Sequence, residues 1–139
     1  MGSAVAFVGA ARHPEIRAAV VENSFTTYTH ALDYYSWHKF HLPRFPLIAL
    51  IQWRANMKLD DDPEKWSPIR HAAGMRTPVL FVHAENDPIM PVNDSRTLHG
   101  LAQGPKELWI VPNARHEDVH EVAKEEYQRR IGGFFARHL

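Results

Sequence analysis

Residues 77–87 read TPVLFVHAEND, a continuous apolar run that ends in a polar turn. A run without alternation of apolar and polar side chains is typical of a strand that a parallel sheet buries on both faces. The segment that follows, NDSRTLHGLAQG (residues 93–104), has helical spacing, and we expect Asn93 or Asp94 as its N-cap and Gly104 as its stop. Together the two segments predict one strand–helix unit of a parallel sheet.

The same alternation continues in both directions along the chain. KELWIVP (residues 106–112) predicts a second strand, and the apolar positions from Glu117 to Leu139 predict one amphipathic helix. IRAAVVENSF (residues 16–25) predicts a short buried strand, and it follows a small, apolar helix that His13-Pro14 ends. Alternating helices and strands of this kind are typical of the α/β class, here with about three parallel strands and flanking helices.

Residues 28–59 interrupt this pattern. They are rich in aromatic side chains and His, are broken at Pro43 and Pro46, and then regain helical spacing. We therefore interpret them as an inserted pair of helices that forms a cap. The short segment SPIRHAAGM (residues 67–75) predicts a helix with Ser67 as its N-cap.

Composition and charge restrict the class of protein. The 139 residues suggest a single domain, and 16 Lys+Arg balance 16 Asp+Glu, which argues against a nucleic-acid partner held by bulk charge. The chain has no Cys, so disulfides and thiol nucleophiles are excluded. No apolar run has the roughly 18 residues of a membrane span, and no basic region precedes the N-terminal apolar stretch. The expected compartment is therefore the cytoplasm.

Two polar residues follow the two C-terminal predicted strands. Asp87 comes after the strand of residues 77–86, and His116 comes after that of residues 106–112. Because functional groups of parallel sheets gather beyond the carboxyl ends of the strands, we expect the two side chains to meet there within hydrogen-bond reach.

A metal site is the alternative for His116. The segment HEDVH (residues 116–120) matches the spacing at which His116 and His120 hold zinc on one helix face, with Glu117 as general base. His116 precedes the predicted helix, however, so the two imidazoles need not share a face. Clustered carboxylates in LDDDPE, which contains Asp60 to Asp62, offer a second alternative, a calcium loop, but they lack the spacing of an EF-hand. We therefore predict no bound metal and no cofactor.

The stretches TPVLFVHAENDPIMPVNDSRTL and KELWIVPNARHED resemble the C-terminal half of an α/β-hydrolase, in particular the serine esterases and peptidases related to dienelactone hydrolase. The resemblance extends over essentially the whole chain and implies a partial α/β-hydrolase domain in residues 1–139, with residues 28–59 as a cap-like insert. The triad of this fold follows the chain order Ser, Asp, His. The resemblance therefore implies that Asp87 is the triad acid and His116 the general base.

The nucleophile of such a triad lies in a G-x-S-x-G motif, which this sequence lacks. The opening MGSAVAF aligns with the segment that follows the family's serine, so Met1 falls directly after the nucleophile position. The resemblance thus implies that the Met1 backbone N–H belongs to the oxyanion hole and that the nucleophile would precede residue 1. Alternatively, MGS is a remnant of cloning.

The aromatic side chains of the insert admit two interpretations. They can line an acyl pocket, with Trp37, Phe40 and Trp53 as the predicted substrate-binding residues, or they can form a small core for the insert helices. In a partial domain the same apolar surface also suits an interface, and an apolar strand with an open edge invites pairing with another chain. We therefore expect a homodimer.

Two functions of different kinds follow from the sequence. The first is hydrolysis of an ester, lactone or amide, with a small-molecule substrate and with only weak activity if the nucleophile is missing from the chain. The second is a non-catalytic or metal-assisted module derived from a hydrolase that acts as an oligomer.

Overall fold

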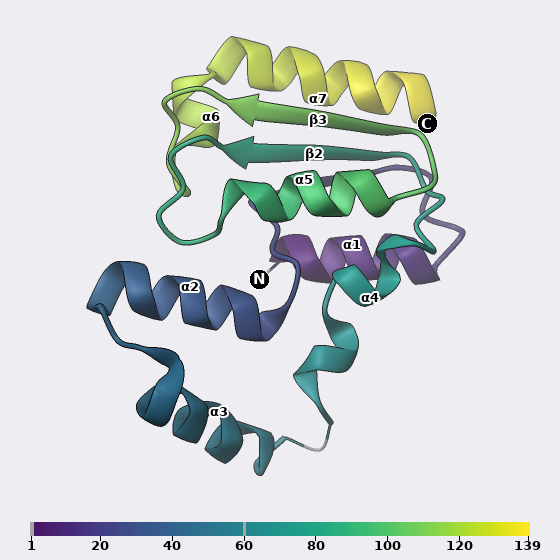
Figure 1. The fold of residues 1–139 in the computed structure, drawn as a ribbon. Helices are drawn as coiled ribbons and strands as arrows, with labels where there is room; N and C mark the ends of the chain where they lie inside the picture. The colour runs from purple at the N-terminus through teal and green to yellow at the C-terminus, as the bar shows by residue number, and fades with distance from the viewer. Residues whose placement is uncertain (1, 60) are drawn as a thin grey trace.

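The computed structural model describes residues 2–59 and 61–139 (Figure 1). Its elements alternate as the sequence predicts: helix, strand, helical insert, strand, helix, strand, helix. The three strands are parallel and helices flank them, which confirms the predicted α/β class. In chain order the elements are α1 (Gly2–Arg12), β1 (Ala19–Glu22), α2 (Tyr28–Phe40), η1 (Arg44–Ile48), α3 (Ala49–Asn56), η2 (Pro63–Trp66), α4 (Ile69–Ala72), β2 (Val79–Ala84), α5 (Val92–Leu101), β3 (Lys106–Val111), α6 (Val119–Val122) and α7 (Lys124–His138).

The sheet has the order β1-β2-β3. In its register Ala19 lies beside Val79, and Val79 lies beside Lys106. All six residues of β2 are buried, because strands lie on both of its edges and helices cover both of its faces. In the described part of the chain β1 pairs with β2 alone, so it is an edge strand.

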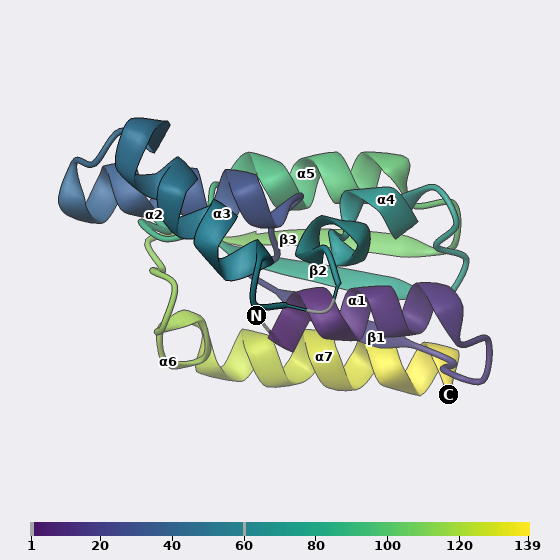
Figure 2. The ribbon, with the colours of Figure 1, turned by 90° about the horizontal axis from the view of Figure 1, so that it is seen from below.

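Two apolar clusters, one on each face of the sheet, make up most of the core. On one face Phe7 of α1 packs on Phe81 of β2 with ring centroids 5.8 Å apart, and Leu98 of α5 joins the same cluster. On the other face Phe134 of α7 packs with Trp109 of β3 and its neighbours. Figure 2 shows α5 and α7 on opposite sides of the strands. Successive strand residues point to opposite faces, so each apolar strand supplies both clusters.

The insert extends away from the sheet (Figure 1). Its first helix, α2, begins after Thr27, whose side chain accepts a hydrogen bond from the His30 N–H, and it ends at His41, which has a left-handed φ of 53°. The second helix, α3, has no buried residue. The predicted pair of helices is therefore present, but α3 has little contact with the rest of the chain.

Two predicted helix caps are wrong. Ser67 does not cap α4; its Oγ accepts from the Tyr28 N–H, 3.1 Å away, at the start of α2. Helix α5 begins at Val92 without a side-chain cap, and the carboxylate of Asp94 instead accepts from the N–H of Thr26, 2.8 Å away. In both cases the tertiary fold brings the side-chain oxygen to a donor that is distant in sequence.

The C-terminal segment also differs from the prediction. Two helices, α6 and α7, replace the single predicted helix, because Ala123 leaves the helical region with φ −121° and ψ 31°. Helix α5 ends at Leu101, before the predicted stop at Gly104. Among residues 2–59 and 61–139, no helix combines the length and the apolar character that crossing a membrane requires.

Candidate active site

The site lies where the loops after β2 and β3 meet, beyond the carboxyl ends of the strands. Backbone hydrogen bonds join the two loops: the Asn86 N–H donates to the Ala114 carbonyl at 2.9 Å, and the Glu85 N–H donates to the Val111 carbonyl at 3.0 Å. Asn113 turns the chain after β3 with a left-handed φ of 61°, a conformation that Asn tolerates better than most residues. Parallel pairing of the strands thus brings Asp87 and His116 to the same edge.

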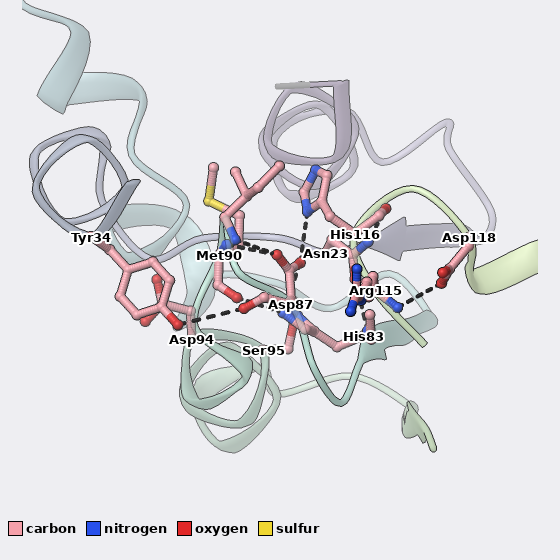
Figure 3. A network of polar contacts seen from close by, with 12 residues as sticks. Asn23, Tyr34, His83, Asp87, Met90, Asp94, Ser95, Arg115, His116 and Asp118 are labelled. Carbon is pink, nitrogen blue, oxygen red and sulfur yellow. Dashed lines mark hydrogen bonds and ion pairs between the residues drawn. The ribbon is translucent and has the colours of Figure 1, made fainter. Parts of the chain in front are cut away.

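Asp87 and His116 are in direct contact. Nδ1 of His116 lies 2.6 Å from Oδ2 of Asp87, which confirms the predicted proximity (Figure 3). The Asp87 side chain has no exposed surface, whereas that of His116 is 29% exposed. A carboxylate accepts hydrogen bonds, so in the neutral imidazole the proton lies on Nδ1 and Nε2 keeps its lone pair. The imidazole can therefore take a proton from a group on its accessible side.

The second oxygen of Asp87 is bound by its own loop. Oδ1 accepts from the N–H groups of Ile89 at 2.7 Å and Met90 at 2.9 Å. These two bonds fix the plane of the carboxylate and leave Oδ2 directed at His116. The acid is thus held in one orientation before any substrate arrives, which is the arrangement that an orienting residue needs.

A buried histidine lies behind this pair, and the sequence interpretation assigned it no role. His83 is the fifth residue of β2 and has no exposed surface. Its Nδ1 lies 2.6 Å from Oγ of Ser95, and its Nε2 lies 3.2 Å from the carbonyl oxygen of Met90. Burial lowers the pKa of His83, against smaller opposing effects of the Met90 carbonyl and the Asp87 charge. Neutral His83 is therefore favoured in the folded chain.

Asn23, at the end of β1, supports His116 from the other side. Its Nδ2 donates to the His116 carbonyl at 2.9 Å, and its Oδ1 accepts from the Ala84 N–H at 2.9 Å. Asn23 is buried and has a left-handed φ of 48°. The sequence by itself assigns Asn23 no role in the site. A positive φ in a short polar residue is visible only in the structure.

Tyr34 of α2 connects the insert to the site. Its hydroxyl lies 3.5 Å from the backbone carbonyl of Asp87, a contact at the limit of a hydrogen bond. Burial, followed by the negative charges of Asp87 and Asp94, raises the pKa of Tyr34. The sequence by itself assigns Tyr34 no role in the site.

The residues of the metal alternatives do not assemble. His116 is bonded to Asp87, while His120 lies on α6 and packs edge-on against Tyr127. Within residues 2–59 and 61–139, no three side chains of His, Asp or Glu come together as a metal site would require. Glu117 was the predicted base of that alternative, and no hydrogen bond joins its side chain to His116 in the described part of the chain. Asp60, of the acidic cluster, and Met1, the predicted oxyanion donor, lie outside the described residues.

The predicted substrate-binding residues do not line the larger cavities. Trp37, Phe40 and Trp53 are each more than half exposed. A cavity of about 560 Å³ instead lies between α2, α3 and the loop after β2, and Ile89 and Met90 connect it to the loop that holds Asp87. A larger cavity, of about 820 Å³, runs along α1 and shares no residue with that loop. We regard the smaller one as relevant to the site, because its wall continues into the Asp87 loop.

Comparisons with known proteins identify similar chains. No family model matches the sequence. Protein YqkD of Bacillus subtilis is 24% identical over 136 residues, which cover 96% of this chain and 45% of YqkD. The uncharacterized peptidase YuxL of the same organism is 28% identical over 132 residues, which cover 88% of this chain and 19% of YuxL. The chain therefore spans less than half the length of these two relatives.

Solved structures share the fold. The esterase Pf2001 of Pyrococcus furiosus superimposes with a TM-score of 0.71 at 18% identity, covering 98% of this chain and 50% of the esterase. An acylaminoacyl peptidase of Pyrococcus horikoshii gives a TM-score of 0.72 at 16% identity, covering 99% of this chain and 22% of the peptidase. Identities this low establish similarity of fold alone. The chain has the α/β-hydrolase fold and matches half of the length of the esterase Pf2001.

Proposed function

We propose that this chain carries the acid–base pair of a hydrolase that cleaves esters, lactones or amides, with His116 as general base and Asp87 as the residue that orients it. The observation that carries the proposal is the 2.6 Å contact between His116 Nδ1 and the fully buried Asp87 carboxylate. The α/β-hydrolase fold supports it, because this fold places its acid and base after late strands in that chain order.

The chemistry follows from the tautomer. With the proton on Nδ1, the lone pair on Nε2 of His116 accepts the proton of a nucleophilic hydroxyl as its oxygen bonds to the substrate carbonyl carbon. The imidazolium that forms is stabilised by the Asp87 carboxylate. It then returns the proton to the leaving alcohol or amine and is neutral again. If the nucleophile is a side-chain hydroxyl, a water molecule then attacks the acyl ester by the same proton transfers, which releases the carboxylic acid and restores the hydroxyl.

The proposal assigns the nucleophile to none of the serines in the chain. Ser24 and Ser36 are buried, Ser67 bonds to Glu64 and Tyr28, and Ser95 bonds to His83. Ser3 lies within α1, and no serine in residues 2–59 or 61–139 has a hydrogen bond to the His116 ring. With the residues of this chain alone, the attacking group is a water molecule that His116 activates, and turnover is expected to be slow.

The cavity between α2 and α3 suits the acyl side of such a substrate. Its walls are mainly apolar, formed by side chains that include Phe25, Leu32, Ile51 and Met90. An apolar cavity beside a polar pair favours a substrate with an aliphatic or aromatic group next to the carbonyl.

Turnover of a short-chain p-nitrophenyl ester tests the proposal. We expect His116→Ala to lower kcat/KM by about 10²-fold or more, the usual contribution of a general base. Asp87→Asn should lower it as well, because an amide that donates to Nδ1 moves the imidazole proton to Nε2.

His120→Ala is the matched control, since it removes the other histidine of HEDVH, which lies on α6 away from the pair. Equal activity of the parent, His116→Ala and His120→Ala would contradict the proposal and favour a non-catalytic module. A loss with His120→Ala and with a chelator would instead point to the metal-assisted alternative.

A further inference from the structure

We infer that His83 is a positioning residue: the N–H at its Nε2 holds the Asp87 loop in the form that aims the carboxylate at His116. The inference rests on the proposed function, because it concerns the orientation of the same acid. It does not make His83 a group that touches substrate, since the side chain has no exposed surface.

The hydrogen bonds of His83 determine its tautomer. The backbone carbonyl of Met90 can only accept, so the contact of 3.2 Å from its oxygen requires a proton on Nε2. Nδ1 is then unprotonated and accepts from the hydroxyl of Ser95, 2.6 Å away on α5. A neutral imidazole with both nitrogens bonded satisfies the rule that buried polar groups have partners.

The proton on Nε2 also faces the catalytic acid. Nε2 lies 3.5 Å from Oδ2 of Asp87, the oxygen that accepts from His116 (Figure 3). This distance is too long for a strong hydrogen bond, but the partial positive charge of the N–H favours the carboxylate oxygen on that side. His116 and His83 thus approach the same oxygen from two directions.

Met90 links His83 to Asp87 through two backbone hydrogen bonds. Its carbonyl accepts from His83, and its own N–H donates to Oδ1 of Asp87 at 2.9 Å. A single peptide segment is therefore bonded to His83 on one side and to the acid on the other. Loss of the His83 donor would release the Met90 carbonyl, and the turn that directs Oδ2 at His116 would lose its anchor to β2 and α5.

A purely structural role for His83 makes a different prediction. If the ring only fills space in the core, any side chain of similar size and polarity should preserve the site. If the donor at the Nε2 position matters, the effect of a substitution depends on whether it restores an N–H at that place. Gln has the length to present its amide near the former Nε2, whereas Asn reaches only the region of Nδ1 and Ser95.

The test observes the hydrogen bond between His116 and Asp87 by NMR in the full chain with ¹⁵N-labelled histidine. In the parent we expect a His116 Nδ1–H proton that is strongly shifted downfield and protected from exchange with water. His83→Gln should keep this signal, and His83→Asn should lose it, with both variants folded as judged by their amide spectra. Equal behaviour of the two folded variants, both keeping or both losing the signal, would overturn the inference.

A measurement on the parent chain covers the case in which His83→Asn does not fold. Ring ¹⁵N shifts report the tautomer of His83 directly, and we expect a protonated Nε2 and an unprotonated Nδ1. A His83 protonated on Nδ1 alone would overturn the inference. Neither readout depends on turnover, so failure of ester hydrolysis would count against the proposed function without deciding the role of His83.

Discussion

Individual residues support the site through contacts that span the chain. Asn23 bonds to the backbone of both His116 and Ala84, and so ties the end of β1 to the loop of the base and to β2. Asp94 accepts from the backbone and the hydroxyl of Thr26 and lies 3.2 Å from His30, which anchors the start of the insert to α5. Buried polar groups with several partners each hold their segments in one arrangement.

Tyr127 gives a prediction of pH dependence. Its hydroxyl donates to Glu22 at 2.9 Å, and burial followed by this carboxylate raises its pKa from 10.0 to about 12. Because the folded-state pKa is raised, the protonated phenol stabilises the fold below about pH 10, and this contribution disappears as the pH rises through about 12. Urea unfolding of the parent and of Tyr127→Phe at several pH values measures it.

We expect the parent to be more stable than Tyr127→Phe by about 1 kcal/mol at neutral pH, with the difference shrinking above pH 10. Tyr127→Phe serves as the control, because it keeps the aromatic ring that packs on Trp109 and removes only the hydroxyl that titrates. Parallel curves for the two proteins across this range would contradict the assignment.

At the scale of elements, the connection from α5 to β3 packs against the connection from α4 to β2. The N–H groups of Gln103 and Gly104 both donate to the Met75 carbonyl at 2.9 Å. A Cβ on Gly104 would lie 2.1 Å from the backbone oxygen of Arg76, so no larger residue fits without a shift of the main chain. Gly104 is therefore required by close approach of two backbones and not as the stop of α5.

Gly104→Ala should destabilise the chain by about 1–3 kcal/mol, the usual cost of forcing extra atoms into a packed place. Gly100→Ala, four residues earlier within α5, is the matched control, because its Cβ would meet nothing within 4 Å. We expect Gly100→Ala to be neutral or to stabilise by about 0.5–1 kcal/mol, since Ala is the better helix former. Equal unfolding midpoints for the two variants would show that the backbone contact is relaxed.

At the scale of the whole molecule, unpaired surface is the most distinctive feature. Strand β1 has a partner on one edge alone among the described residues, and the insert exposes a set of large apolar side chains. Phe45 is 79% exposed, and Trp37, Leu50, Trp53 and Met57 are each more than half exposed. Apolar surface of this extent usually marks an interface.

We therefore expect the chain to associate with itself at micromolar concentration, through an interface that buries more than about 1,000 Å². Sedimentation should show a species heavier than the monomer mass of 16.0 kDa. Phe45→Ser and Trp53→Ser should weaken the association, whereas Val122→Ser, at an exposed position on α6, should leave it unchanged. A monodisperse, folded species at the monomer mass would exclude the predicted homodimer.

The local pattern of the sequence was enough to predict the strands, their parallel direction and the proximity of Asp87 and His116. A strand that is buried on both faces has an unbroken run of apolar residues in the sequence. The residues that follow such parallel strands all lie at the same edge of the sheet. The helices of the insert were also predictable from the local sequence, because its Pro residues and the spacing of its aromatic residues do not suit a strand. The caps were not predictable: Ser67 and Asp94 accept from Tyr28 and Thr26, 39 and 68 residues away.

Tertiary structure alone decided what surrounds the acid–base pair. His83 appears in the sequence as one more residue of a buried strand, and its bonds to Ser95 and Met90 exist because α5 and the Asp87 loop fold back over β2. The exposure of Trp37 and Trp53 likewise depends on how far the insert stands from the sheet. Apolar periodicity is a local property that a sequence records directly, whereas the partner of a buried polar atom is whichever group the complete fold brings within hydrogen-bond distance.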